Sequence, residues 1–265
     1  MIRIPSVDRD APILVIGVGN TNTHVATWSE ARLKTPLSAR TDDPAAIEEI
    51  LGAHLEAMTK SQPAAAVMGS VVPAAADRIA QFVEARIGKR ALQIGDSLPL
   101  PIDLTVDDKS QVGVDRVCAA AAAYEKIQAS CVVVDFGTAT TVDLVSDDGE
   151  FLGGAILPGM HLQLKALSEH TALLPEVEPG FPELPYGRNT TEAMQTGVCR
   201  GMAGAVRNIV EGYATSLNHW PQVVATGGDV ELLSAHCDFL DILVKDLTLH
   251  GIALAYTKHL AEMGA

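Results

Sequence analysis

The sequence predicts an α/β protein built from two duplicated lobes, each a mixed sheet flanked by helices. The composition, a repeated strand–turn–strand pattern and the alternation of helices and strands after each copy support this fold class. Of the 265 residues, 48% are hydrophobic and 20% are charged, which is typical of a folded globular chain. This length suits one large domain or two of ordinary size, and the repeat favours two.

The first copy of the pattern begins with the apolar run 12–17, which is typical of a strand buried on both faces. Polar turn residues follow at 19–22, and 25–28 resumes as a second strand, so a hairpin is expected. The pattern then predicts helices over 44–58 and 74–87 and strands over 64–69 and 92–94. Residues 1–10 are polar and predict a flexible extension, which leaves 11–116 for the first lobe.

The second copy lies 118 residues further along the chain. This offset places Gly17 with Asp135, Gly19 with Gly137, Asn20 with Thr138 and Thr23 with Thr141. The segment 132–141 is expected to form an apolar strand and a Gly-Thr turn, followed by strands over 142–145 and 151–156. The segment 221–228 is expected to form a strand that ends in a Gly-Gly turn, and helices are expected over 117–128, 161–168, 191–218 and 247–263. A hairpin followed by alternating helices and strands is typical of a ribonuclease-H-like lobe, and we expect the second lobe to span 117–265. The last helix of this lobe can pack back on the first lobe.

The two turns have the residue types that a phosphate site needs. Glycine lets a phosphate approach the backbone, and Thr or Asn side chains donate hydrogen bonds to its oxygens. Alone, Gly19-Asn20-Thr21 is more simply an ordinary hairpin turn. Together with the segments 135–138 and 225–228, which end in Gly-Thr and Gly-Gly, it predicts a nucleotide site.

Charge and spacing exclude several other classes of function. The net charge of −14 argues against nucleic acid as a partner, because binding its backbone depends on Lys and Arg. The four cysteines are too widely spaced for a metal site or a disulfide framework, so free thiols in a reducing cytoplasm are expected. The histidines have no metal-binding spacing and predict core or surface roles. No apolar run reaches 18 residues, so a membrane protein is not expected.

Several motifs resemble the type III pantothenate kinase family. They are the segments 16–23, 113–116 and 135–159, with 186–194 and 224–228 in support, and the resemblance covers about residues 13–260. It implies the actin/Hsp70/sugar-kinase architecture with an ATP cleft between the lobes. It also implies ATP-dependent phosphorylation of pantothenate to 4′-phosphopantothenate, the first step of coenzyme A biosynthesis.

The resemblance makes Asp115 the proton acceptor. A primary alcohol is a poor nucleophile, and a carboxylate within hydrogen-bond reach can orient it and take its proton. Arg116 beside it can offer a planar fork to the carboxylate of the substrate. From spacing alone, a second interpretation stays open, in which Asp115 and Arg116 cap an Ala-rich helix that begins at Val117.

The family motifs assign the remaining site residues. Asp135 would hold a monovalent cation, K⁺ or NH₄⁺, and ATP would arrive with Mg²⁺. The family is a homodimer, and Thr190 would meet pantothenate from the second subunit. The expected ATP contacts are Gly17, Val18, Gly19, Asn20, Thr21, Asn22, Thr23, His24, Thr138, Gly227 and Gly228. The expected pantothenate contacts are Val106, Gly113, Val114, Asp115, Arg116 and Thr190.

Two positions depart from the family pattern. The first turn usually opens with an acidic residue that helps to place magnesium, and here that residue is Gly17; Asp135 and Asp143 are possible substitutes. A tyrosine often stands where this chain has Val106. These departures leave two alternatives, namely a weak or inactive regulator that binds nucleotide or pantothenate, and a kinase of another small alcohol.

Overall fold

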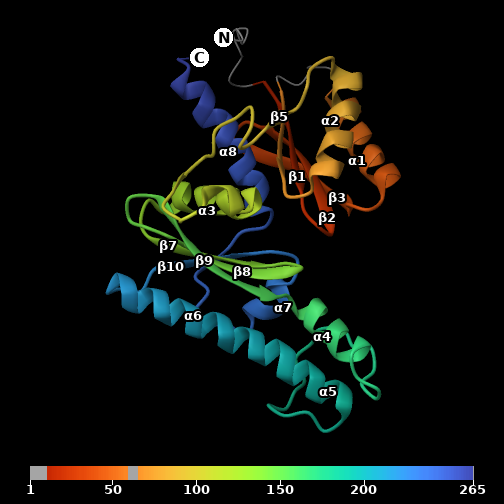
Figure 1. Cartoon of the computed structure of the whole chain (residues 1–265), viewed down its shortest axis with the longest axis vertical. Coiled ribbons are helices and arrows are strands. Elements are labelled where there is room, and N and C mark those ends of the chain that lie inside the picture. The colour runs from red at the N-terminus through yellow and green to blue at the C-terminus, as the bar shows by residue number, and fades with distance from the viewer. Residues whose placement is uncertain (1–10, 59–64, 265) are drawn as a thin grey trace. The chain divides into compact units, whose positions relative to one another are not determined.

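The computed structural model describes residues 11–58 and 65–264, which form two compact units (Figure 1). The first unit runs to Asp103 and also includes Asp107–Glu125 and the chain from Asp246 onward. The second comprises Leu104–Val106 and Lys126–Lys245. The boundary therefore lies inside helix α3 (Val114–Ile127), and helix α8 (Leu247–Glu262) belongs to the first unit. The predicted extension 1–10 lies outside the described residues.

The first unit is a five-stranded sheet with helices on both faces. Its strand order is β3 (Arg32–Arg40), β2 (Asn22–Ser29), β1 (Ile13–Val18), β4 (Ala66–Ser70) and β5 (Leu92–Gln93), with β1–β3 antiparallel and β4 and β5 parallel to β1. Leu14 and Ile16 face helices α1 (Pro44–Ala57) and α2 (Pro73–Ile87), whereas Ile13 and Val15 face α8. Figure 1 shows this layering. Side chains alternate between the two faces because the strand has a period of two.

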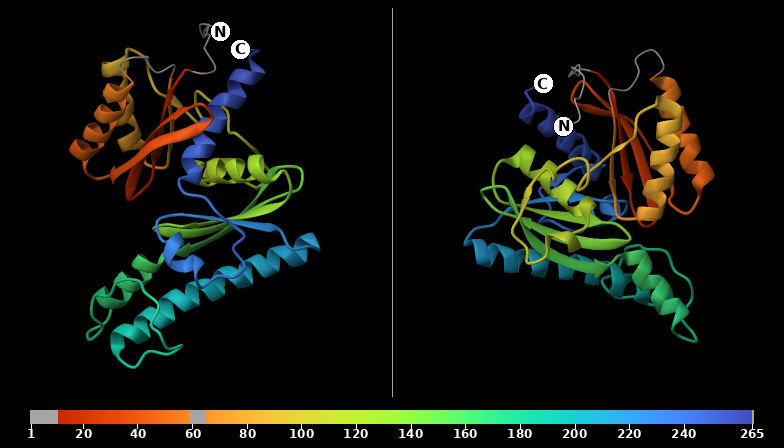
Figure 2. Two further views of the ribbon diagram at one scale, coloured as in Figure 1. Left: turned by 180° about the vertical axis from the view of Figure 1, so that it is seen from behind. Right: turned by 45° about the horizontal axis from the view of Figure 1, so that its top comes forward.

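The second unit repeats this plan with six strands. Their order is β11 (Ile242–Leu243), β10 (Gln222–Thr226), β7 (Cys131–Phe136), β8 (Ala139–Val145), β9 (Glu150–Pro158) and β6 (Asp103–Leu104). Its helices are α4 (Met160–Glu169), α5 (Thr190–Gln195), α6 (Gly201–Leu217) and α7 (Val230–Ser234). Phe136 of β7 shares one apolar core with Met202 and Val206 of α6, which lies along the sheet in Figure 2.

The predicted fold class and duplication are confirmed. The strand order β3-β2-β1-β4-β5 recurs as β9-β8-β7-β10-β11. An offset of 118 carries the bounds of β1 onto those of β7 and the bounds of β3 onto those of β9. The second strands slip by one residue, because Val18 pairs with Thr23 whereas Phe136 pairs with Thr140. The structural counterpart of Thr23 is therefore Thr140, and that of His24 is Thr141.

Several elements differ from the sequence prediction. The expected helix over 191–218 is divided by a π-helical turn at Thr196–Arg200. The Ala-rich helix begins at Val114, not Val117, and is preceded by a 3-10 turn at Lys109–Gln111. The spacing of Gly197, Gly201 and Gly204 predicts tight helix packing, but a Cβ added at each would meet no atom within 4 Å among the described residues outside its own stretch of helix. No helix of the described segments has the length and apolar character to cross a membrane.

Candidate active site

The first turn (Gly17–His24) joins β1 to β2 and is braced from inside. Thr41, which follows β3, donates its N–H to the Thr21 carbonyl (2.9 Å) and its Oγ1–H to the Gly19 carbonyl (2.7 Å). Thr23 Oγ1 lies 3.1 Å from Thr41 Oγ1. Because the Thr41 hydroxyl donates to Gly19, Thr23 donates to Thr41. Both threonines are buried, so the Thr23 hydroxyl supports the turn from within the protein.

The α8 side of this turn has a glycine opposite a histidine. Gly17 pairs directly with His24, so both face the same side of the sheet. A Cβ at Gly17 would lie 3.2 Å from Leu249 Cδ2 of α8. Burial lowers the pKa of His24, and the negative charge of Asp246 partly opposes that shift. Position 17 therefore offers no carboxylate to a magnesium ion carried by ATP.

Asp115 lies in the first turn of α3, near the end of β4. The Val71 N–H donates to the Val18 carbonyl (3.1 Å), and a Cβ at Gly113 would lie 3.7 Å from Val71 Cγ1. The start of α3 thus lies where β1 and β4 end, the edge of an α/β sheet at which ligands commonly bind. Asp115 is half-buried, and its Oδ1 accepts from the Arg116 N–H at 2.8 Å.

The cap interpretation of Asp115 and Arg116 assumed a helix that begins at Val117. The helix instead begins at Val114, so both residues lie inside its first turn rather than before it. A carboxylate there is stabilised by the partial positive charge of the helix N-terminus. The position therefore places a partly exposed carboxylate at the N-terminal end of the helix.

The second turn (Asp135–Thr141) joins β7 to β8 and carries carboxylates. Asp135 pairs with Thr141, whose hydroxyl donates to Asp143 Oδ2 at 3.1 Å. Gly227 has φ +101°, and a Cβ there would lie 2.5 Å from Asp135 Oδ1, so this close approach needs glycine. Thr138 is exposed at the tip of the turn.

The donor types beside the second turn fit a hard monovalent cation. The carboxylate of Asp135 stands near the end of β7, beside the backbone carbonyls of the turn, and such cations prefer oxygen ligands. In the described part of the chain, no three His, Cys, Asp or Glu side chains gather as a metal site. A cation at Asp135 would therefore need backbone or ligand oxygens to complete its shell.

Two further segments flank the second turn. The Gly159 N–H donates to the Thr138 carbonyl (2.9 Å), and the Asp229 N–H donates to the Phe136 carbonyl (3.1 Å). His161, two residues after Gly159, has Nε2 at 3.3 Å from Asp229 Oδ1. The sequence prediction left His161 and Asp229 out, because contacts between residues 68 positions apart have no local signal.

The two remaining predicted substrate contacts also lie in the second unit. A Cβ built at Gly153 of β9 would lie 3.7 Å from Val106 Cγ1. Thr190 is exposed at the start of α5. Asn189 Oδ1 accepts the Glu192 N–H at 2.9 Å, an N-cap that fixes the backbone at Thr190.

The predicted site residues fall into one group in each unit. The first unit holds the residues of the first turn together with Gly113, Val114, Asp115 and Arg116. The second unit holds Val106, Asp135, Thr138, Thr190, Gly227 and Gly228. The sequence did not predict a role for Thr41. Its role depends on hydrogen bonds to Thr23 and to the Gly19 carbonyl, and no sequence motif indicates such contacts.

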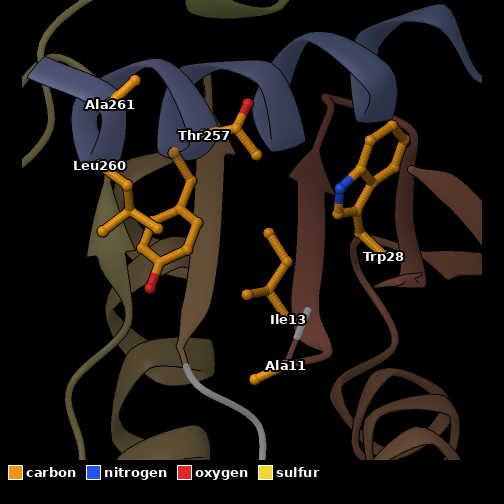
Figure 3. A pocket seen from close by; sticks show the side chains of 7 residues that line it. Ala11, Ile13, Trp28, Thr257, Leu260 and Ala261 are labelled. Carbon is orange, nitrogen blue, oxygen red and sulfur yellow. The ribbon is translucent and has the colours of Figure 1, made fainter. Parts of the chain in front are cut away.

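A separate hollow in the first unit is lined by residues of β1, β2 and α8 (Figure 3). It has a volume of about 220 Å³ and is lined mainly by apolar side chains, among them Ile13, Trp28 and Leu260. Ile13 begins β1, whereas Gly17 and Val18 end it. The hollow is therefore distinct from the predicted phosphate site.

The four cysteines are buried free thiols, as the spacing predicted. Burial raises the pKa of Cys131 to about 12 and that of Cys237 to about 11. Such thiols stay protonated at neutral pH and do not act as nucleophiles.

Comparisons with known proteins agree with the motifs. The family model for type III pantothenate kinase matches residues 13–212. Proteins named type III pantothenate kinase are similar over nearly the whole chain. The one from Desulfatibacillum aliphaticivorans is 32% identical over 93% of this chain and 98% of its own. The one from Gluconobacter oxydans is 35% identical over 91% of this chain and 92% of its own.

Solved structures of low sequence identity share the fold. The ethanolamine utilization protein EutJ from Carboxydothermus hydrogenoformans superposes with a TM-score of 0.54 at 16% identity, over 94% of this chain and 92% of its own. Component A of the (R)-2-hydroxyglutaryl-CoA dehydratase from Acidaminococcus fermentans superposes with a TM-score of 0.56 at 13% identity, over 95% of this chain and 99% of its own. These neighbours have the actin-like ATPase fold, which agrees with the predicted architecture.

Proposed function

This chain belongs to the type III pantothenate kinase family, and we propose that it transfers the γ-phosphate of ATP to the terminal hydroxyl of pantothenate. The product would be 4′-phosphopantothenate, the first intermediate on the route to coenzyme A. The observation that carries the proposal is Asp115, a half-buried carboxylate in the first turn of α3 beside the ends of β1 and β4. A proton acceptor for an alcohol must be a carboxylate that the hydroxyl can reach.

In the proposed reaction, Asp115 orients the hydroxyl and takes its proton as phosphoryl transfer proceeds. Arg116, next in the chain, would hold the pantothenate carboxylate, with Gly113, Val114 and Val106 as further contacts. Residues of the first turn, with Thr138, Gly227 and Gly228, would contact ATP through backbone N–H groups and hydroxyls. Such transfer depends mainly on positioning and electrostatics.

We propose that Asp135 holds K⁺ or NH₄⁺ when ATP binds. The carboxylate and the nearby turn carbonyls suit either cation, which would offset part of the triphosphate charge. The first turn has no carboxylate for a cation at the corresponding position, which is Gly17. Burial also lowers the pKa of His24 beside it. Magnesium would arrive bound to ATP as part of the substrate.

We propose a cytoplasmic homodimer in which Thr190 reaches the pantothenate of the partner subunit. Support comes from large apolar side chains of the second unit that are exposed in the single chain: Leu152 (38%), Ile156 (63%), Leu162 (46%), Leu173 (91%) and Tyr186 (62%). Side chains of this kind mark a protein interface where they form one contiguous patch, which the proposed dimer would bury. A monomeric mass in solution at working concentration would overturn the dimer.

The direct test is an assay of the purified protein with ATP, magnesium, potassium and pantothenate, in which 4′-phosphopantothenate is measured. Asp115→Asn should lower kcat by about 10²- to 10⁴-fold, the range for loss of a general base. The matched control is Asp77→Asn, which removes an exposed carboxylate from α2 of the same unit. Equal rates for the unaltered protein and Asp115→Asn would exclude Asp115 as the proton acceptor.

Two observations favour specific rivals, and the same assay separates them. Gly17 favours a regulator that binds nucleotide or pantothenate without turnover, which predicts ATP binding but no phosphorylated product. Val106, where the family often has tyrosine, favours another small alcohol as acceptor, which predicts turnover only with that alcohol. Product from pantothenate that depends on Asp115 would exclude both rivals.

A further inference from the structure

The second turn is enclosed by two segments that are distant in sequence. Gly159, at the end of β9, bonds to the Thr138 carbonyl, and a Cβ there would lie 2.6 Å from the same oxygen. On the other side, Gly227 lies against Asp135, and the Asp229 N–H bonds to the Phe136 carbonyl. Both flanking segments therefore touch the backbone that is proposed to hold ATP.

His161 joins these flanking segments. It lies in the first turn of α4, and its Nε2 is 3.3 Å from Asp229 Oδ1 while its Nδ1 is 3.3 Å from Glu178 Oε2. Both ring nitrogens can donate at once only when the ring carries two protons. Asp229 is the N-cap residue of α7, yet its side chain makes no capping bond. Its carboxylate is thus available to His161.

The two carboxylates differ in how firmly they can hold the ring. The Asp229 side chain is 19% exposed, whereas the Glu178 side chain is 89% exposed. An ion pair that water reaches freely contributes little, so Asp229 should be the stronger partner. The carbonyl of Glu178 accepts from Gln195 Nε2 at 3.0 Å, which fixes that segment independently of His161.

We propose that His161 is a positioning residue for ATP, which ties the start of α4 to Asp229 and so closes a ring around the second turn. This inference rests on the proposed function, because it assumes that the second turn, Gly227 and Gly228 hold the nucleotide. His161 acts through the turn and touches neither the acceptor alcohol nor its proton. Its loss should therefore weaken ATP binding and leave the chemical step nearly intact.

The test measures binding and turnover separately. His161→Gln should raise the KM for ATP about fivefold, the upper effect of an exposed polar pair, with kcat and the KM for pantothenate within about twofold. Binding of the non-hydrolysable analogue AMP-PNP, measured by calorimetry, should weaken by the same factor. The control is Lys165→Gln, which breaks an exposed pair with Glu169 one turn further along α4.

A double-mutant cycle identifies the partner. Asp229→Asn should weaken AMP-PNP binding as His161→Gln does, and the double variant should lose no more than the larger single loss. Glu178→Gln should change binding by less than about twofold. Strict additivity of His161→Gln and Asp229→Asn would overturn the pairing.

The outcomes also separate this inference from the proposed function. If the unaltered protein phosphorylates pantothenate and His161→Gln binds AMP-PNP as tightly as Lys165→Gln, the positioning role is wrong and the function stands. If AMP-PNP binding depends on His161 but no pantothenate is phosphorylated, the role stands and the substrate assignment fails. A protein that does not bind AMP-PNP would overturn both.

Discussion

The first and second turns share one backbone plan but are held by different side chains. After the third strand of each unit, an N–H bonds to a turn carbonyl at 2.9 Å, from Thr41 to Thr21 and from Gly159 to Thr138. After the fourth strand, an N–H bonds at 3.1 Å to the carbonyl that ends the first strand. In the first unit this bond runs from Val71 to Val18, and in the second from Asp229 to Phe136.

The two turns differ in the residues that follow the third and fourth strands of each unit. Thr41 fills its position with a buried hydroxyl, whereas Gly159, its counterpart, leaves that space to the turn backbone. Val71 directly follows β4, but Gly227 and Gly228 intervene between β10 and Asp229, and Gly227 lies against Asp135. The first turn is thus braced by hydroxyls, and the second is surrounded by glycines and carboxylates. We infer that cation handling belongs to the second turn.

The largest expected effect tests that division of roles. Asp135→Asn should lower kcat/KM for ATP by about a hundredfold, the typical loss when a charge-stabilising group is removed from a transfer site. It should also abolish the response of the rate to added potassium. The measurement is the steady-state rate with and without potassium. A variant that still responds to potassium would place the cation elsewhere.

The next effect separates the backbone of the second turn from the hydroxyls of the first. Gly159→Ala should destabilise the protein by about 2 kcal/mol, because its Cβ would press on the Thr138 carbonyl and the backbone must shift. Urea unfolding measures this loss.

The counterpart variant is Thr23→Val, which keeps the shape but removes the donor to Thr41 Oγ1 and leaves the bond from Thr41 to the Gly19 carbonyl in place. We expect a loss of about 1 kcal/mol, the net contribution of one hydrogen bond. Equal losses for Gly159→Ala and Thr23→Val would contradict the difference in how the two turns are held.

The sequence predicted the duplication well, because glycines, threonines and apolar runs have strong local signals. It did not predict β3, an edge strand whose Arg, Lys and Pro36 are unlike a buried strand. A constant offset of 118 also could not predict that the pairing of the second strand is shifted by one residue between the two units. Register depends on which residues pair and not on their spacing in the sequence. His161 and Thr41 were missed because their roles arise from tertiary contacts.

A smaller effect should follow when the missing carboxylate is restored to the first turn. Gly17→Asp should raise kcat/KM for magnesium-ATP about fivefold. A metal ligand can contribute several kcal/mol, but crowding against Leu249 Cδ2, 3.2 Å from the new Cβ, offsets most of it. The control is Gly17→Ala, which adds the crowding without the charge. A rate at or below that of the unaltered protein would show that this carboxylate does not limit the reaction.

The smallest effect concerns acidic pH, which should lower the stability of the first unit before that of the second. His54 of α1 is 4% exposed, and its Nδ1 lies 3.1 Å from Thr27 Oγ1. Burial is the main cause that lowers the pKa of His54. By contrast, His161, His170, His219 and His236, the histidines of the second unit, are exposed.

The sign follows from the lowered pKa. In the unfolded chain His54 takes up a proton near its ordinary pKa of about 6.5, whereas in the folded protein it does so only at lower pH. The contribution of neutral His54 is therefore complete above pH 6.5 and decreases as the pH falls from there towards the folded pKa. Hydrogen exchange at pH 7.5 and 5.5, each corrected for the intrinsic rate, should show lost protection in α1 and β2 but not in β7 and β8. His54→Leu should reduce this pH dependence, and the part that remains should belong to His24 of β2, whose pKa burial also lowers. An unchanged pH dependence in His54→Leu would show that His54 is not responsible.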